Sequence, residues 1–310
     1  MTSGDRFNAD HLGLSLTQAE RLYFQMRLIR EFETTLLDLF SQNAVFGTTH
    51  TCLGQEANAV AIMEALDRNI DTVWSNHRCH GHFLAYCGKV AELFAEIMGR
   101  ELGVCAGRGG SQHICWHRFH SNGVQGGIVP LALGTAMAGK AEGAVTVVFL
   151  GDGTLGQGVV YECLNLAALW QLPVLFVLED NGVAQTTPSE LVFSGNAQAR
   201  AEAFGLESAY SDTSEVMALH ATASDLISRI RNGGSPCFWH IRSVRLGPHS
   251  KGDDTRSPEQ MAALQQRDPV RLNERLVDTP LRLEQRCKTI IREALAQAEA
   301  SPVNDGSLTA

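Results

Sequence analysis

The sequence of 310 residues lacks features that mark whole classes of protein. It has no apolar stretch near the ~20 residues that a membrane-spanning helix needs. Lys and Arg number 25 against 34 Asp and Glu, so the net basic charge typical of nucleic-acid binders is missing. Residues 1–20 contain no basic segment followed by an apolar one, which argues against a secretory signal. We therefore expect neither a membrane nor a nucleic-acid partner.

C-x-x-C pairs are also missing, and the eight cysteines are scattered along the chain. That pattern is typical of reduced, mostly buried thiols and of a cytoplasmic protein. Apolar residues at 44% and charged residues at 19% are ordinary globular proportions. Glycine is in excess, with 29 residues, and many of them fall between positions 99 and 158. We therefore expect functional residues in that part of the chain.

Hydrophobic spacing predicts an α/β protein. Helices are expected over residues 18–41, 56–66, 91–98, 130–140, 156–170, 214–230 and 281–300. Short apolar runs predict strands over residues 71–74, 145–150, 173–178 and 238–244. Two of these runs, joined by a helix, form a βαβ unit, which requires a parallel sheet covered by helices on both faces.

The same pass along the chain gives the domain organisation. Residues 1–16 are expected to form a flexible arm, and residues 17–300 a single α/β domain with N- and C-terminal helical extensions. Residues 99–127 show no period, and residues 246–269 are polar, so both are expected to be loops. Residues 301–310 are expected to be a disordered tail.

A glycine motif follows the predicted strand over residues 145–150. Gly151-Asp-Gly-Thr-Leu-Gly156 satisfies G-x-G-x-x-G, and an acidic pair ends the next strand, as in dinucleotide-binding proteins. In such a turn the pyrophosphate lies against main-chain amides at the helix N-terminus. Asp152 would repel it unless a divalent cation lay between the two groups.

Asn181 supplies a second oxygen ligand for such a cation. It lies 29 residues after Asp152, just past the neighbouring strand. Parallel strands end at the same edge of a sheet, so the two side chains can converge there. Mg²⁺ prefers oxygen ligands and often shares them between protein and phosphate. We therefore favour a metal–diphosphate site, although the dinucleotide interpretation stays open.

A Gly-Asp-Gly motif followed after about thirty residues by Asn resembles the thiamine diphosphate motif. Over roughly residues 20–270 the chain is similar to alpha subunits of the decarboxylating first component of 2-oxo acid dehydrogenase complexes, of the pyruvate, branched-chain and acetoin type. The matching segments, in order, are His50-x-x-x-Gly54-Gln-Glu-Ala57, His77-Arg-x-His-Gly81, Gly107-x-Gly-Gly-Ser-x-His113, Asn122-Gly-Val-x-Gly126, Pro130, Gly151-Asp-Gly153, Asn165-Leu-Ala-Ala168, Glu179-Asp-Asn-Gly182 and Gly247-Pro-His-Ser250.

The resemblance implies the thiamine diphosphate-binding fold, with thiamine diphosphate and Mg²⁺ as cofactors and a 2-oxo acid as substrate. It implies that the acyl unit passes to a lipoyl acyltransferase, and that a separate beta subunit completes an α₂β₂ heterotetramer. Three alternatives stay open. They are an acyloin-forming carboligase built from the same two subunits, an NAD-dependent Rossmann enzyme, and a catalytically silent scaffold subunit.

The resemblance also assigns roles to residues. Asp152, Asn181 and the Val183 carbonyl would hold Mg²⁺. The implied cofactor-binding residues are His77, Arg78, Gly123, Val124, Gln125, Gly151, Asp152, Gly153, Thr154, Asn181, Val183 and His249. The implied catalytic residues are His50, His113 and His249. Four positions differ from residues common in the family, namely His77, Gln125, Asp180 and Val183.

One further cluster of metal-ligand residue types is visible. His113-x-Cys115-x-His117-x-x-His120 places four such residues within eight positions. Its spacing is not that of common zinc sites, and the family resemblance already accounts for His113. Zinc binding is therefore only an alternative here.

Overall fold

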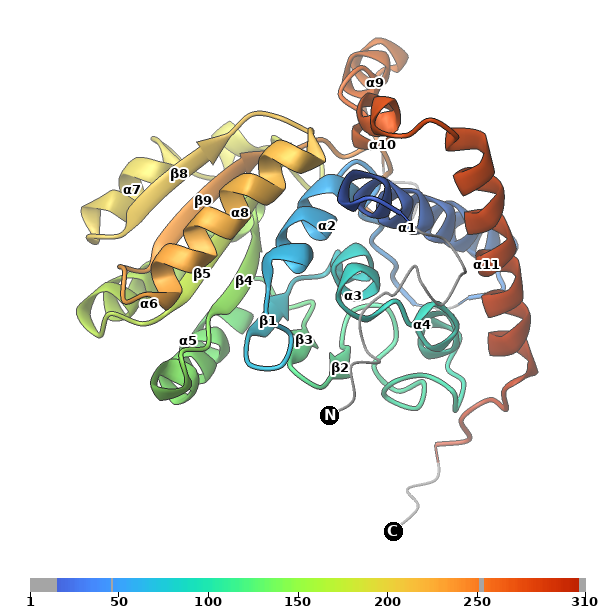
Figure 1. Cartoon of the computed structure of the whole chain (residues 1–310), viewed down its shortest axis with the longest axis horizontal. Helices are drawn as coiled ribbons and strands as arrows, with labels where there is room; N and C mark the ends of the chain where they lie inside the picture. The colour runs from blue at the N-terminus through green and yellow to red at the C-terminus, as the bar shows by residue number, and fades with distance from the viewer. Residues whose placement is uncertain (1–15, 46, 251–253, 307–310) are drawn as a thin grey trace.

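The computed structural model describes residues 16–45, 47–250 and 254–306. Its centre is a seven-stranded sheet in which only β2 runs antiparallel to its neighbour (Figure 1). The strand order is β2, β3, β1, β4, β5, β9, β8. The strands are β1 (Thr72–Ser75), β2 (Cys115–Trp116), β3 (Phe119–Ser121), β4 (Thr146–Gly151), β5 (Val174–Asp180), β8 (Glu207–Ser211) and β9 (Cys237–Arg242). This confirms the predicted parallel sheet.

The two central strands are buried on both faces, as the apolar runs over residues 147–150 and 174–178 require. Successive side chains of β4 point to opposite faces, so Val147 and Phe149 join one core while Val148 and Leu150 join the other. The second core includes side chains of α5 (Ile128–Gly139), α6 (Gly158–Leu169) and α7 (Ala197–Ala203). The predicted covering of both faces is therefore present.

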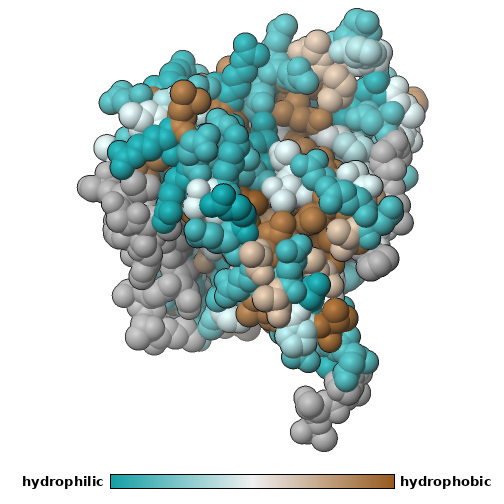
Figure 2. Space-filling view, turned by 90° about the vertical axis from the view of Figure 1, so that its right-hand side faces the viewer, coloured by the Kyte–Doolittle hydropathy of each residue, from teal (hydrophilic) through white to brown (hydrophobic). Residues whose placement is uncertain are grey.

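The larger core lies on the opposite face of the sheet. Its helices are α1 (Gln18–Ser41), α2 (Glu56–Ala65), α3 (Cys79–Cys87), α4 (Val90–Ile97), α8 (Val216–Arg231) and α11 (Pro280–Ala300). The last helix packs against α1 and α4 at the side of the molecule far from β8 (Figure 1). Its buried side chains recur every three or four residues: Leu283, Cys287, Ile291, Ala294 and Ala298. Hydrophilic side chains cover much of the outer face on which α11 lies (Figure 2).

Several expectations about local structure were wrong. The polar segment expected to be a loop contains α9 (Pro258–Gln265), which a capping box from Ser257 to Gln260 starts and which buries no residue. It is followed by α10 (Pro269–Asn273). The expected loop over residues 99–127 contains two short strands. The helix expected to begin at Gly156 begins at Gly158, after a 3₁₀ turn over Asp152–Gly156.

Residues 301–304 also differ from the disordered tail that was expected. The Glu101 amide donates to the Pro302 carbonyl and the Asn304 amide to the Gly99 carbonyl, each at 2.9 Å. Arg100 Nη1 donates to the Ser301 carbonyl at 2.6 Å. These hydrogen bonds order residues 301–304. The segment has no hydrophobic pattern from which its order could be predicted. The arm expected over residues 1–16 falls almost wholly outside the described residues.

None of the described helices has the length and apolarity needed to cross a lipid bilayer.

Candidate functional site

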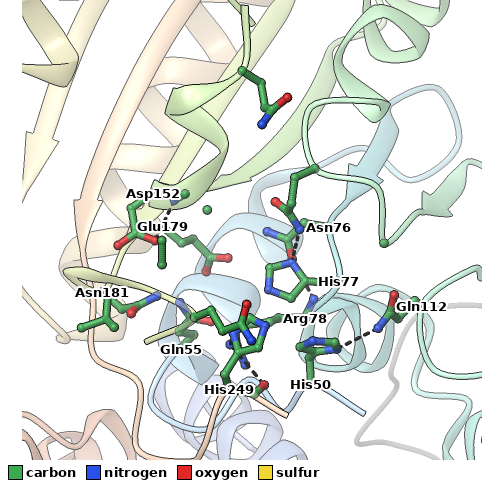
Figure 3. A pocket seen from close by; sticks show the side chains of 18 residues that line it. His50, Gln55, Asn76, His77, Arg78, Gln112, Asp152, Glu179, Asn181 and His249 are labelled. Atoms are coloured by element: carbon green, nitrogen blue, oxygen red, sulfur yellow. Dashed lines mark hydrogen bonds between the residues drawn. The ribbon is translucent and has the colours of Figure 1, made fainter. Parts of the chain in front are cut away.

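A cavity of about 350 Å³ opens at the carboxyl ends of β1, β4 and β5. Each of these strands delivers polar residues directly after its last sheet position, which is where parallel α/β sheets place ligands. The lining residues are His50, Gln55, Asn76, His77, Arg78, Gln112, Gly123, Gln125, Gly151, Asp152, Gly153, Gln157, Glu179, Asn181, Val183, Ala184, Gln185 and His249. Figure 3 shows an acidic side with Asp152, Glu179 and Asn181, and a side with Arg78 and three histidines.

The acidic side holds an incompletely satisfied pair of oxygen ligands. Asp152 is buried and accepts hydrogen bonds from Ser189 Oγ and, at 3.0 Å, from the Gly153 amide. Burial raises the pKa of this carboxyl despite those bonds, and the charge of nearby Asp180 raises it further. Asn181 Oδ1 is buried and has no hydrogen-bond partner within the described residues. A buried acceptor without a partner is costly, and a hard cation would satisfy both oxygens.

The turn that carries Asn181 is held by its neighbour. Asp180 accepts hydrogen bonds from His240 Nε2 at 2.9 Å and from the Gly182 amide at 2.8 Å, and pairs with Arg242 Nη1 at 2.9 Å. Burial alone would raise the pKa of Asp180, but the His240 bond and the Arg242 charge lower it to about 2. Gly182 has φ +81°, the left-handed conformation that a side chain rarely adopts. Asp180 is therefore ionised and fixes the turn.

Gly153 allows a short strand to pack closely on the turn beside Asp152. A Cβ atom at Gly153 would lie 2.9 Å from the Ala184 Cβ, closer than real Cβ atoms approach. The short strand β6 (Val183–Ala184) thus packs directly on the Asp152–Gly156 turn, which only glycine permits. Gly153 and Asp152 both line the cavity.

On the opposite side of the cavity, Arg78 is a buried cation. It is 4% exposed, and its Nη1 donates to the Thr51 carbonyl at 2.6 Å. Its Nη2 lies 3.1 Å from His249 Nδ1. Burial, with the positive charge of Arg245, lowers the pKa of Arg78 to about 10, so the guanidinium is charged at neutral pH. Within the described residues no carboxylate forms an ion pair with this buried guanidinium, which therefore suits a bound anion.

Three histidine rings gather beside Arg78. The ring centroid of His50 lies 4.9 Å from that of His77 and 4.7 Å from that of His249. Gln125 Nε2 lies 2.6 Å from His77 Nδ1, and Thr154 Oγ1 donates to Gln125 Oε1 at 2.6 Å. Burial, with the charges of Arg78 and the other two rings, holds the pKa of His77 well below its usual value. His77 is therefore a neutral ring at pH 7.

The loop that brings Gln112 to the cavity is organised by one buried carboxylate. Glu96 is fully buried and accepts four main-chain N–H groups, from Cys105, Gly107, Gly109 and Gly110, over 2.6–3.2 Å. The loop has no regular structure because its amides point inward at this carboxylate. Gln112 Nε2 then lies 2.7 Å from His50 Nδ1.

Three of the residues assigned from sequence are not in the cavity lining. His113 is exposed, because its neighbours Ser111 and Ile114 take the inward positions. Val124 is 62% exposed. Thr154 is buried and reaches the lining only through its bond to Gln125. The structure brings the other assigned residues together, namely His50, His77, Arg78, Gly123, Gln125, Gly151, Asp152, Gly153, Asn181, Val183 and His249.

Sequence reasoning missed seven lining residues: Gln55, Asn76, Gln112, Gln157, Glu179, Ala184 and Gln185. Glu179 is the most telling, since it is a buried carboxylate beside Asp152 (Figure 3). It accepts from Asn58 Nδ2 at 3.0 Å and lies 3.5 Å from His82 Nε2. Glu179 could have been predicted from its position directly before Asp180, because the same strand end also carries Asn181.

No group of three or more His, Cys, Asp or Glu side chains in the described part of the chain is arranged to hold a metal ion. This finding gives no support to the zinc alternative for residues 113–120. Asp152 and Asn181 together offer a carboxylate and an amide oxygen, which is a partial ligand set. A metal ion bound there would need further oxygens from a bound ligand.

Comparison with known proteins decides the family. The model of the dehydrogenase E1 component family matches residues 24–304. The chain belongs to the dehydrogenase E1 component family. This confirms the predicted resemblance and enzyme class, that of an E1 alpha subunit of a 2-oxo acid dehydrogenase, and the family implies thiamine diphosphate as the cofactor. The dinucleotide interpretation of the glycine motif is thereby replaced.

Curated relatives of this E1 chain carry two kinds of name. The alpha subunit of acetoin:2,6-dichlorophenolindophenol oxidoreductase from Bacillus subtilis is 35% identical over 307 residues, covering 94% of this chain and 92% of the relative. The protein of the same name from Cupriavidus necator is 37% identical over 256 residues, covering 80% and 77%. The pyruvate dehydrogenase E1 component subunit alpha of Zymomonas mobilis is 36% identical over 240 residues, covering 76% and 68%.

Proposed function

We propose that this E1 chain binds Mg²⁺ and the diphosphate of thiamine diphosphate, and that it decarboxylates a 2-oxo acid together with a beta subunit. The observation that carries the proposal is the buried Asn181 Oδ1, which lacks a partner within the described residues and lies on the Asp152 side of the cavity. Bound thiamine diphosphate supplies a carbon nucleophile and an electron sink for decarboxylation.

The residues present fit that cofactor by charge and by space. Asp152, Asn181 and the Val183 carbonyl would hold Mg²⁺, and the Gly153 amide, in the cavity lining, would face the diphosphate. Arg78 would pair with the diphosphate from the opposite side, where its guanidinium is buried and charged. Neutral His77 would donate a hydrogen bond to the same group. Gly123 and Gln125 would contact the aminopyrimidine through main-chain atoms.

The remaining histidines would act on the substrate. His50 and His249 line the cavity beside Arg78, and His249 Nδ1 faces the Arg78 guanidinium at 3.1 Å. A ring whose Nδ1 accepts from a cation carries its proton on Nε2, so His249 can donate that proton toward developing negative charge. His113 is exposed, so its proposed role would require a partner chain to cover it.

The proposal includes other chains. We infer an α₂β₂ heterotetramer in which the beta subunit faces the cavity and provides the carboxylate that activates the cofactor. The acyl unit then passes to a lipoyl acyltransferase. Relatives that are named as alpha subunits support the need for a second kind of chain. The relatives named for acetoin favour a second candidate substrate, a 2-hydroxyketone that the same site would cleave.

The test is made on the complex. The tagged chain is purified from its own cells with the proteins that copurify, and 2-oxo acid- or acetoin-dependent reduction of 2,6-dichlorophenolindophenol is measured with and without thiamine diphosphate and Mg²⁺. We expect activity that requires both, and little or none from the isolated chain. Robust turnover by the isolated chain would remove the beta subunit from the proposal. Acyloin formation without a copurifying lipoyl acyltransferase would favour a carboligase.

A further inference from the structure

Two of the eight cysteines differ from the rest in exposure. Six are buried, whereas Cys115 is exposed and Cys105 is half-buried. The Cys105 sulfur lies 3.3 Å from the Cys115 amide nitrogen and 3.6 Å from the Cys115 carbonyl oxygen. The two cysteines, ten positions apart in the sequence, are therefore in direct contact. Neither belongs to the cavity described above.

A histidine is in contact with the exposed thiol. Cys115 of β2 pairs with His120 of β3 across an antiparallel ladder, which places both side chains on one face of the sheet. The Cys115 sulfur lies 3.5 Å from His120 Nδ1. The His120 ring stacks on Trp74 at a centroid distance of 4.6 Å, which fixes its orientation. Burial lowers the pKa of His120, so its ring is neutral at pH 7 and has one nitrogen without a proton.

Both main chains around this pair are held in place. The Cys105 amide donates to the buried Glu96 carboxylate at 2.7 Å. Cys115 lies in the sheet, where its strand pairs with β3. Bond formation requires rotation about the Cα–Cβ bond of Cys115, which would turn its sulfur from His120 toward the Cys105 sulfur. Side-chain rotation of an exposed residue is fast and has a low energy cost.

We propose that Cys105 and Cys115 form a reversible disulfide under peroxide, with His120 as the base that activates Cys115. His120 takes the thiol proton, and the Cys115 thiolate attacks one peroxide oxygen. The O–O bond breaks, and the leaving hydroxide takes the proton from His120, so that a sulfenic acid and water form. The Cys105 thiol then attacks that sulfur and releases a second water as the S–S bond closes. Two thiols and one hydrogen peroxide thus give one disulfide and two waters, the two electrons passing from sulfur to oxygen.

The consequence is a covalent closure of residues 105–115. This segment contains the glycines that bind Glu96 and also Gln112, which contacts His50 in the cavity. Disulfides in reducing compartments are usually transient and redox-sensing, which fits a pair with one exposed thiol. The inference does not depend on the cofactor, so it stands or falls separately from the proposed function.

The experiment is peptide mapping of the full chain without reductant, after a few equivalents of hydrogen peroxide and alkylation of the remaining thiols. We expect one cross-linked peptide pair that contains Cys105 and Cys115, reversal by dithiothreitol, and six alkylated cysteines as an internal control. In Cys105→Ser a sulfenic acid at Cys115 should be trapped by dimedone, and in Cys115→Ser neither product should form.

The role of His120 has its own control. His120→Phe keeps an aromatic ring on Trp74 but removes the base, and should slow oxidation of Cys115 roughly tenfold. His117→Asn, a change in the same segment at a left-handed position that Asn tolerates, should leave the rate unchanged. Thermal melting checks that each variant is folded. The proposal is overturned if Cys105 stays a free thiol while Cys115 is oxidised, if neither reacts, or if both histidine variants react at the wild-type rate.

Discussion

The side-chain nitrogen of Gln125 lies 2.6 Å from Nδ1 of His77, at the wall of the cavity. Thr154 Oγ1 donates to the other end of the same amide at 2.6 Å, which sets the amide's orientation. His77 Nδ1 is then an acceptor, and the ring proton lies on Nε2. A neutral His77 in this tautomer can donate from Nε2 to a phosphate oxygen.

Gln125→Val removes this constraint on His77. We expect a loss of about 1 kcal/mol in thiamine diphosphate binding, roughly fivefold in affinity, measured by calorimetric titration of the complex in Mg²⁺. Ring ¹⁵N shifts of His77 in the free chain should show an unprotonated Nδ1 in the wild type and mixed tautomers in the variant. Thr154→Val, which removes only the outer hydroxyl, serves as the matched variant with a smaller effect. Wild-type tautomer and affinity in Gln125→Val would contradict the assignment.

Asp152→Asn should weaken Mg²⁺-dependent cofactor binding while stabilising the cofactor-free chain. Removing a residue that only orients a metal ligand can lower metal affinity by roughly 100-fold. Removing a direct ligand is expected to lower it by at least as much. Burial raises the pKa of Asp152 on folding, so the ionised group opposes folding at neutral pH. The variant should therefore melt higher than the wild type at pH 7, and this difference should vanish at low pH, where Asp152 is protonated in both states.

The control for that experiment is Asp278→Asn, at an exposed aspartate. It should change neither the melting temperature nor the affinity beyond experimental error. If Asp152→Asn bound Mg²⁺ and cofactor as the wild type does, the metal assignment would fail even if the melting temperature rose.

Glu96→Gln should destabilise the fold through the loop over residues 103–110. Glutamine offers one acceptor oxygen to four inward-pointing amides and turns an N–H₂ group toward some of them. We expect a loss of about 3 kcal/mol in the free energy of unfolding, measured by urea denaturation. Hydrogen exchange should rise at the amides of Cys105 and Gly109. Glu92→Gln, one turn earlier on α4 and in a partly exposed ion pair with Lys89, should cost less than about 1 kcal/mol.

Asp180→Asn tests the acid-sensitive turn beside Asn181. Folding lowers the pKa of Asp180 from 3.8 to about 2, so its stabilising contribution is complete above about pH 5 and is lost as pH falls toward 2. The difference in free energy of unfolding between wild type and variant should shrink over that window. Arg242→Gln should give a similar pH dependence, and the double variant should add little to either. A difference independent of pH would show that Asp180 acts through packing rather than charge.

Much of the fold could be predicted from residue order alone. The runs over residues 145–150 and 173–178 are apolar at every position except Thr146, and only a strand covered on both faces can bury them all. The capping box at Thr17 and Glu20 marks the start of α1. In contrast, α3 is buried at every position and so lacks the amphipathic spacing that reveals a helix.

The candidate site divides in the same way. Asp152 and Asn181 could be paired from sequence, because parallel strands bring their carboxyl ends to one edge, and the family resemblance added Arg78 and the histidines. The contacts that orient these groups could not be predicted, since Glu96, Gln112 and Thr154 act through loops whose path has no period. The sequence by itself determined which chemical groups reach the sheet edge, because local patterning fixes the strands. Only the tertiary structure decided that His113 faces outward and that Cys105 contacts Cys115. It also decided that Asn181 Oδ1 lacks a partner within the described chain. The reason is that burial and hydrogen bonding depend on residues far apart in sequence.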